Sequence, residues 1–466
     1  MVDKGEYIRP LGNMEILMAI GGMYGSWNTT QTLWLQSKHP IIPADVQNAL
    51  QEVMDKTLIL QVCVVWRRMR LWFKQIKELR LDFKVDDSDV MSIIHQQLHQ
   101  PYNMKKGPLW RARLVPIQKQ SSSDPHRSAL TISVHHCITD GYTNMKICRN
   151  ILEVLNASLT GRIQELLESP VFPAATDTLM TIGDWGFRIK NVLKHFYEKI
   201  IKDFSREIYF DGALSQPCTK IAHTKFLREN FTVEETRKLL QHCKENGVKL
   251  NSCILATANL ALLETVQQRV NYRVDETRII SCTSIDMRRY FSMEMKQATG
   301  CHISFDENDM LITTKSSNNM ENFWSLVNTF QKNLDENLND NLFSIRIART
   351  FRYASILLSV NYELTRRGWK NKICNHFFCT NMGNLRSTLP PKYNGPIEVT
   401  DLLRSGSGEF SGNLFTLVYH TFDERFMVSM DYFTNKLTEE DASKFFSLWT
   451  QHIRNIAHYG TAQEPT

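Results

Sequence analysis

The sequence lacks the features that mark a spanning, secreted or metal-ribbon protein. It has no uncharged apolar run of about 18 residues, the length that a spanning helix needs. Its first residues, MVDKGEY, are too polar for a secretory signal. The ten cysteines are scattered without a CxxC pair, so the spacing of zinc ribbons and thioredoxin-type sites is absent. We therefore expect free thiols, a cytoplasmic location and no bound metal.

A large excess of charge of one sign is also missing. The 55 Lys and Arg residues and the 49 Asp and Glu residues leave a formal net charge of +6. This excess would suit an anionic small ligand, but it does not indicate a nucleic-acid partner. Hydrophobic residues make up 42% of the chain and charged residues 22%, which excludes wholesale disorder.

Helix and strand patterns alternate irregularly along the 466 residues, which predicts a mixed α/β (α+β) fold rather than a regular barrel. Helical spacing of apolar residues occurs at 43–58, 87–98, 145–159, 177–204, 251–270, 320–338, 349–364 and 438–458, and a capping box begins a further helix at Thr232. Strand patterns occur at 129–134, 278–283, 376–380, 414–421 and 426–432, with a turn at 381–384. A boundary is expected near 209–220, where Gly and Pro interrupt the pattern.

The sharpest local motif is HHCITDG at 135–141, between a predicted strand and a predicted helix. A histidine at a strand end lies at the rim of a sheet, where sites form, and a neutral imidazole can accept a proton from a hydroxyl or amine. Gly141 is expected to permit the turn into the helix. A bare HxxxD should occur by chance about once in such a chain. His302 to Asp306 is a second copy, but it lacks the preceding His and the following Gly, so we interpret it as structural.

The HHxxxDG pattern resembles the motif of the chloramphenicol-acetyltransferase-like acyltransferases. These include peptide-synthetase condensation domains, plant BAHD enzymes, mycobacterial polyketide-associated acyltransferases and fungal alcohol acetyltransferases. Three stretches follow the family's order: RPLG at 9–12 with Glu15, DMRR at 286–289, and TNMG at 380–383 in place of SNxG. The plant DFGWG segment is absent, and SGSGEFSG at 405–412 is interpreted as a flexible loop rather than a phosphate-binding loop. Free-standing alcohol acetyltransferases are the most similar branch.

The resemblance implies two similar halves around a central tunnel, residues 1–210 with HHxxxDG and residues 211–466 with the DxR and TNMG segments. It implies that His136 is the general base and that Asp140 pairs with Arg288. The implied catalytic set is His136, Asp140, His135, Gly141 and Arg288. The implied tunnel residues are Thr380, Asn381 and Gly383.

The implied activity is transfer of an acyl group, acetyl in particular, from acyl-CoA to a hydroxyl of a small apolar alcohol. The donor is a co-substrate, no bound cofactor is expected, and a monomer is expected. Residues that bind CoA are not assigned. Two alternatives stay open: a carrier-protein-dependent enzyme that forms amides or esters, and a non-catalytic member that binds a ligand in the tunnel.

Three further features have two interpretations each. Cys137 could be a nucleophile beside His136, or a core thiol, which we favour. Residues 66–74 interleave basic and aromatic side chains, as single-stranded nucleic-acid sites do, but they also suit a strand or hairpin, which we favour. The amphipathic helix at 177–204 could rest peripherally on an internal membrane, or pack on its own domain, which we favour.

Overall fold

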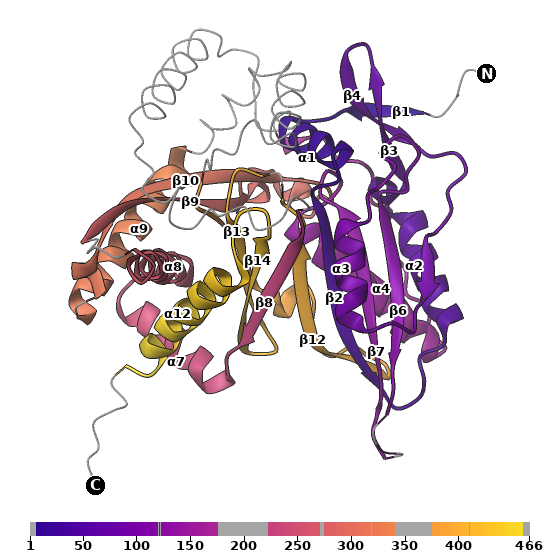
Figure 1. Ribbon diagram of the computed structural model, residues 1–466. Helices are drawn as coiled ribbons and strands as arrows, with labels where there is room; N and C mark the ends of the chain where they lie inside the picture. Colours follow the sequence, from indigo (N-terminus) through magenta and orange to yellow (C-terminus); the bar gives the residue numbers. More distant parts are fainter. Residues whose placement is uncertain are drawn as a thin grey trace.

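The computed structural model describes residues 6–119, 121, 123–175, 222–270, 275–317, 319–340, 375–409 and 411–459. These residues form three β-sheets with helices packed against them (Figure 1), so the expected mixed α/β fold is confirmed. The helices expected at 177–204 and 349–364, the boundary at 209–220, and Cys218 and Cys374 lie outside the described residues. No helix in the described ranges is long and apolar enough to cross a membrane.

The N-terminal part of the chain is built on a five-stranded sheet, to the right in Figure 1. Its strand order is β12 (Ile397–Gly406), β2 (Asn28–Ser37), β7 (His126–His135), β6 (Trp110–Ile117) and β5 (Phe83–Val85). The helices of this part are α1 (Asn13–Met23), α2 (Pro43–Lys56), α3 (Val90–His99) and α4 (Gly141–Leu159). Helices α2 and α4 pack against each other, whereas α3 contacts β2, β7 and a strand of the second sheet, β8 (Thr224–Asn230).

A small sheet of β1 (Tyr7–Pro10), β4 (Arg70–Gln75) and β3 (Val62–Arg67) lies beside this part. Strands β3 and β4 form the hairpin that was favoured for residues 66–74. The guanidinium of Arg67 stacks over the rings of Tyr7 and Trp72, at 4.1 and 5.1 Å from the ring centroids. The interleaved cations and aromatic rings therefore pair with each other within the small sheet.

The C-terminal part is built on a six-stranded sheet, to the left in Figure 1. Its order is β10 (Ile303–Thr313), β9 (Glu276–Asp286), β11 (Phe377–Asn384), β13 (Phe415–Phe422), β14 (Arg425–Phe433) and β8. The helices of this part are α7 (Val233–Glu245), α8 (Leu250–Gln267), α9 (Met320–Asp340) and α12 (Glu439–Ala457). The capping box expected at Thr232 is confirmed: Thr232 Oγ1 accepts from the Glu235 amide at 3.1 Å, and Glu235 accepts from the Thr232 amide at 2.7 Å.

One strand connects the two sheets. β12 follows the six-stranded sheet's β11 in the chain, but it pairs antiparallel with β2 over nearly its full length, including Arg404 with Gln31. The side chain of Ser405 then donates to Asp431 of β14 at 2.5 Å, so β12 also contacts the C-terminal sheet. The five-stranded sheet is therefore completed by residues from the other part of the chain.

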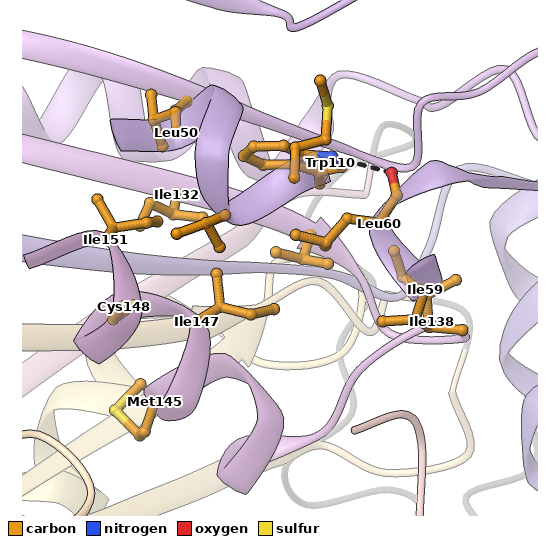
Figure 2. Packing of buried hydrophobic residues seen from close by; sticks show 14 of the residues in the cluster. Leu50, Ile59, Leu60, Trp110, Ile132, Ile138, Met145, Ile147, Cys148 and Ile151 are labelled. Carbon is orange, nitrogen blue, oxygen red and sulfur yellow. Dashed lines mark hydrogen bonds between the residues drawn. The ribbon is translucent and has the colours of Figure 1, made fainter. Parts of the chain in front are cut away.

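The hydrophobic core of the N-terminal part packs against the buried side chains of the motif loop. Figure 2 shows Ile138 of the motif within a cluster that also contains Ile147 and Ile151 of α4. Trp110 is buried in the same cluster, and its indole nitrogen donates to the Leu60 carbonyl at 3.1 Å. Because Cys137 and Ile138 are both fully buried, the loop between β7 and α4 is fixed by packing on its inner side.

The predicted elements are largely confirmed, and two interpretations are wrong. The strand at 376–380 does not end in a turn at 381–384 but continues as β11 to Asn384, with a shift of register between Asn381 and Asn384. The segment 405–412 is not simply a flexible loop, because Ser405 and Gly406 belong to β12. Pairing across the sheet outweighs the low strand preference of Ser and Gly there. All eight described cysteines are free and buried, as expected.

Candidate functional site

The motif loop is fixed at both ends by its own backbone and side chains. The amide of His136 donates to the Trp27 carbonyl at 2.8 Å, where β7 ends. Asp140 then caps α4, since its Oδ1 accepts from the Thr143 amide at 2.9 Å. A carboxylate at a helix N-terminus satisfies a free amide and interacts favourably with the helix dipole.

His136 has the tautomer that a general base needs. Its Nδ1 lies 2.8 Å from the Thr139 carbonyl oxygen, which can only accept, so Nδ1 carries the proton and Nε2 keeps its lone pair. Burial, and then the positive charge of Arg404, lower the pKa of His136 to about 4. The imidazole is therefore neutral near pH 7, and it lines a cavity between the two parts of the chain.

His135 has a different environment, although it is the adjacent residue. It is fully buried and its ring does not line the cavity. Its Nδ1 accepts from the Cys137 amide at 3.2 Å, and burial lowers its pKa to about 3. A Cβ on Gly22 of α1 would lie 2.0 Å from His135 Nε2, so the helix approaches the ring where only glycine fits. The structure therefore places His135 in the support of the loop.

Asp140 and Arg288 form a buried ion pair between the two parts of the chain. Arg288 Nη1 lies 2.9 Å from Asp140 Oδ2, and both side chains are nearly inaccessible. The same guanidinium donates to the hydroxyl of Thr143 at 2.9 Å and to the Ala298 carbonyl at 2.7 Å. Burial alone would raise the pKa of Asp140, but the Arg288 charge outweighs it and holds that pKa below its usual value. Asp140 Oδ2 also accepts from the His302 amide at 2.8 Å. The first residue of the second HxxxD copy therefore helps to hold the aspartate of the first copy.

Gly141 does not have the backbone role that was expected. Its φ is not in the left-handed region, so the turn into α4 does not require glycine. A Cβ at Gly141 would meet Met382 Cγ at 3.7 Å, an ordinary contact distance. Gly141 borders the cavity, and what glycine provides there is space.

The cavity extends from the motif to β11 and β12. It encloses about 1160 Å³ of empty space, counting its open mouth. His136, Asp140 and Arg288 line one wall, and Thr380 and Asn381 line another. The structure therefore brings together residues that lie as far apart in the sequence as His136 and Asn381. Many of the other lining residues are polar, and the apolar side chains among them are Trp27, Met145, Ile303, Phe305, Phe378, Met382 and Leu385.

Gly383 does not line the cavity, contrary to expectation. It is exposed, has a φ of +70°, and its amide donates to Asn381 Oδ1 at 2.8 Å. The left-handed backbone at Gly383 accompanies the shift of register in β11. Gly383 thus shapes the strand that presents Asn381, and it stays outside the wall itself.

Three cavity residues were missed from the sequence. Trp27 has a left-handed φ of 70°, an unusual conformation for an aromatic residue, and its ring meets His136 edge-on at 6.1 Å. Arg404 of β12 is a buried cation on the cavity wall, and its Nε has no hydrogen-bond partner within the described ranges. Asp431 of β14 accepts from the Gly406 amide at 2.9 Å, and burial raises its pKa to about 7.

Of these three residues, Trp27 had a local sequence signal, because its left-handed backbone follows Gly25 and Ser26, a turn-like pair. Arg404 and Asp431 carry no such local signal, because cross-sheet pairing alone brings them to the cavity.

Cys137 is placed as a core thiol. It is fully buried, it does not line the cavity, and burial raises its pKa well above the ordinary value. A nucleophilic cysteine needs access and a lowered pKa. Neither condition holds at Cys137, so the structure favours the core interpretation.

Comparisons with known proteins identify the fold. No family model matches the sequence, and no curated protein matches it. Among solved structures, the chain is similar to TRI3 trichothecene 15-O-acetyltransferase from Fusarium sporotrichioides, with a TM-score of 0.74 and 12% identity over 96% of this chain and 94% of the other. It is also similar to polyketide synthase associated protein 5 from Mycobacterium tuberculosis, with a TM-score of 0.68 and 15% identity over 98% and 100% of the chains.

A third similar structure is the first condensation domain of the CDA synthetase, with a TM-score of 0.62 and 13% identity over 97% of each chain. At these identities the likeness concerns the fold. The chain therefore has the two-subdomain fold shared by condensation domains and chloramphenicol-acetyltransferase-like proteins. These similarities extend over nearly the whole chain.

Proposed function

We propose that the protein is an acyltransferase in which His136 acts as general base, with an acyl-CoA as donor and a small apolar alcohol as acceptor. The observation that carries the proposal is the neutral His136, whose Nδ1–H donates to Thr139 and whose Nε2 lone pair is left to a substrate in the cavity. A positioned imidazole contributes about 10²–10⁴-fold to a reaction that requires proton transfer.

In the proposed reaction, Nε2 takes the proton of the acceptor hydroxyl as its oxygen attacks the thioester carbonyl. The carbon–sulfur bond then breaks, and the imidazolium returns the proton to the departing thiolate, which leaves as free CoA. No acyl-enzyme forms. The role of Asp140 and Arg288 in this scheme is to hold the motif loop, because their charges are used in pairing with each other.

The acceptor class follows from the cavity wall. Aromatic and aliphatic side chains such as Phe305 and Phe378 line the cavity together with many polar side chains, a mixed lining that suits an acceptor with an apolar body whose polar groups fix its orientation. The similarity to a protein named as a trichothecene O-acetyltransferase supports hydroxyl acetylation. The similarity to condensation domains keeps a carrier-bound donor as the second candidate.

The test is incubation of the purified full chain with acetyl-CoA and longer acyl-CoAs against a panel of small alcohols, with CoA release and product mass recorded. The variant His136→Ala should lower kcat by about 10²–10⁴-fold. The matched control is Cys137→Ala, at the next residue, which should keep near-wild-type kcat. Full activity of His136→Ala would falsify the assignment.

The same assay separates the alternatives. Turnover only with an acyl-phosphopantetheinyl carrier protein would replace the acyl-CoA donor by a carrier. An acyl adduct on Cys137, seen by intact mass, would replace direct transfer by covalent catalysis. Absence of turnover with every donor and acceptor, while acyl-CoA or alcohol still binds, would support a non-catalytic member.

A further inference from the structure

Three histidines gather away from the cavity, between the two parts of the chain. His95 and His99 lie four residues apart on α3, so they project from the same face of the helix. His223 lies directly before β8. Each residue offers one ring nitrogen, and these nitrogens lie within 4.8 Å of one another. The ring centroids are separated by 4.3, 4.9 and 5.5 Å. We refer to His95, His99 and His223 as the histidine cluster.

His99 is held in the tautomer of a metal ligand. Its Nδ1 lies 2.7 Å from the carbonyl oxygen of His95, so Nδ1 carries the proton and Nε2 presents a lone pair. Metal-bound histidines usually donate their second nitrogen to such an acceptor. The Nε2 of His99 now accepts from the Thr224 amide at 2.9 Å, a hydrogen bond that a metal would replace.

His223 adds an independent sign of a missing partner. Its Nδ1 is buried and has no hydrogen-bond partner in the part of the chain that is described. A buried polar atom without a partner is unfavourable, so a group that satisfies it is expected.

A buried carboxylate lies beside His99 of the histidine cluster. Glu409, on the segment that follows β12, is only 3% exposed, and its Oε1 lies 3.3 Å from His99 Nε2. It accepts from the hydroxyl of Thr224 at 2.6 Å and from Ser26 at 3.4 Å. No Lys or Arg in the described ranges forms an ion pair with it. The structure therefore places a buried carboxylate, an oxygen ligand that metal ions accept, beside His99.

We propose that His95, His99, His223 and Glu409 bind a divalent transition-metal ion, Zn²⁺ in the first instance. Three imidazoles and a carboxylate match the ligand types and the number that tetrahedral Zn²⁺ takes. Metal–nitrogen distances of about 2.0–2.1 Å require the ring nitrogens to approach more closely than they do now. His95 is exposed, so its ring is free to rotate toward the other two.

The site would join three segments of the chain: α3 of the N-terminal part, the start of β8 in the C-terminal part, and the segment after β12. None of its four ligands lines the cavity. We therefore assign the metal a structural role, in which it fixes the two parts against each other. The inference does not depend on the proposed acyltransferase activity, and its test needs no substrate.

The test uses the full chain without an affinity tag, since a polyhistidine tag would bind the same metals. Zn²⁺ is titrated at pH 7.5 by calorimetry, and Co²⁺ is added separately to record the visible bands of a tetrahedral site. We expect one equivalent of Zn²⁺ and a rise in Tm that EDTA reverses. The variant His95→Gln, at an exposed position, should weaken binding by at least about tenfold.

The matched control is His39→Gln, an exposed histidine outside the cluster, which should bind Zn²⁺ like the wild type. The second variant is Glu409→Gln, which removes the negative charge and should also weaken Zn²⁺ binding. Absence of stoichiometric binding by the wild type, or equal affinity in His95→Gln and His39→Gln, overturns the proposal.

Discussion

The guanidinium of Arg288 lies 2.9 Å from the carboxylate of Asp140, although the two residues are 148 positions apart. Asp140 begins α4 directly after the motif loop, whereas Arg288 follows β9 in the other part of the chain. The ion pair therefore connects the loop that carries His136, which follows the five-stranded sheet, to a residue that follows the six-stranded sheet. Its charges balance each other where water has little access.

Breaking this pair should destabilise the protein strongly. Asp140→Asn keeps an oxygen that can cap α4, but it leaves Arg288 buried without its main counter-charge. Removal of one partner of a buried pair typically costs about 3–5 kcal/mol. Chemical denaturation should show this loss in the free energy of unfolding. Arg288→Met should cost a similar amount, and the double variant should cost less than the sum.

Asp286→Asn is the control for the pair. Asp286 also contacts Arg288, at 2.9 Å, but its side chain is 50% exposed. Exposed ion pairs contribute about 0–1 kcal/mol, so this variant should unfold almost like the wild type. Equal losses in Asp286→Asn and Asp140→Asn would show that the buried pair has no special role.

Arg404 should set the acid limit of activity. Burial and the Arg404 charge both disfavour the protonated imidazole and lower the pKa of His136 to about 4. Removing the positive charge in Arg404→Met should raise that pKa toward its ordinary value near about 6.5. Since the base works only when neutral, the acid limb of kcat/KM should move to higher pH. The pH profile from pH 4 to 8 measures the shift.

Arg404→Lys keeps the charge at the same position and should leave the acid limb near its wild-type place. A shift of equal size in Arg404→Lys and Arg404→Met would indicate altered packing rather than charge. An unchanged limb in both would mean that His136 is not the group whose protonation limits the rate.

Gly22 should tolerate no larger residue. A Cβ there would lie 2.0 Å from His135 Nε2, so Gly22→Ala must displace either α1 or the buried ring. Overpacking of this kind costs about 1–3 kcal/mol. Thermal unfolding should show a clear loss of Tm. Gly141→Ala is the control, because its Cβ would lie 3.7 Å from Met382 Cγ, an ordinary contact. This variant should keep the wild-type Tm.

The sequence was sufficient where local pattern decides structure. The strand before the motif, the helix after it and the capping box at Thr232 follow from spacing and from hydrogen bonds within a few residues. Arg288 was named as the partner of Asp140 through the resemblance. The turn expected to require Gly141 and the tunnel position expected of Gly383 were wrong, because a motif reveals neither the backbone angles of a glycine nor whether it reaches the cavity.

The remaining features depend on long-range pairing. Residues 405–412 suggested a loop, because nothing local indicates that Ser405 and Gly406 pair with β2, more than 370 residues earlier in the chain. Arg404 reaches the cavity through that pairing, and Asp431 reaches it through the pairing of β14 with β13 and β8. In the histidine cluster, His95 and His99 have the i, i+4 spacing of metal ligands on a helix, so these two could have been noticed in the sequence. His223 could not have been linked to them, since only the packing of α3 against β8 brings it near.

The place of β12 has a consequence for expressing parts of this protein. If the N-terminal part were produced alone, β2 would lose its neighbour and become the edge of its sheet. β2 has the sequence NTTQTLWLQS, with no charged residue and no proline along ten residues. Natural edge strands use such residues to prevent pairing with other chains. An isolated N-terminal fragment should therefore associate with itself through β2. In the folded protein, β12 from the C-terminal part covers this edge and so also protects the protein from aggregation.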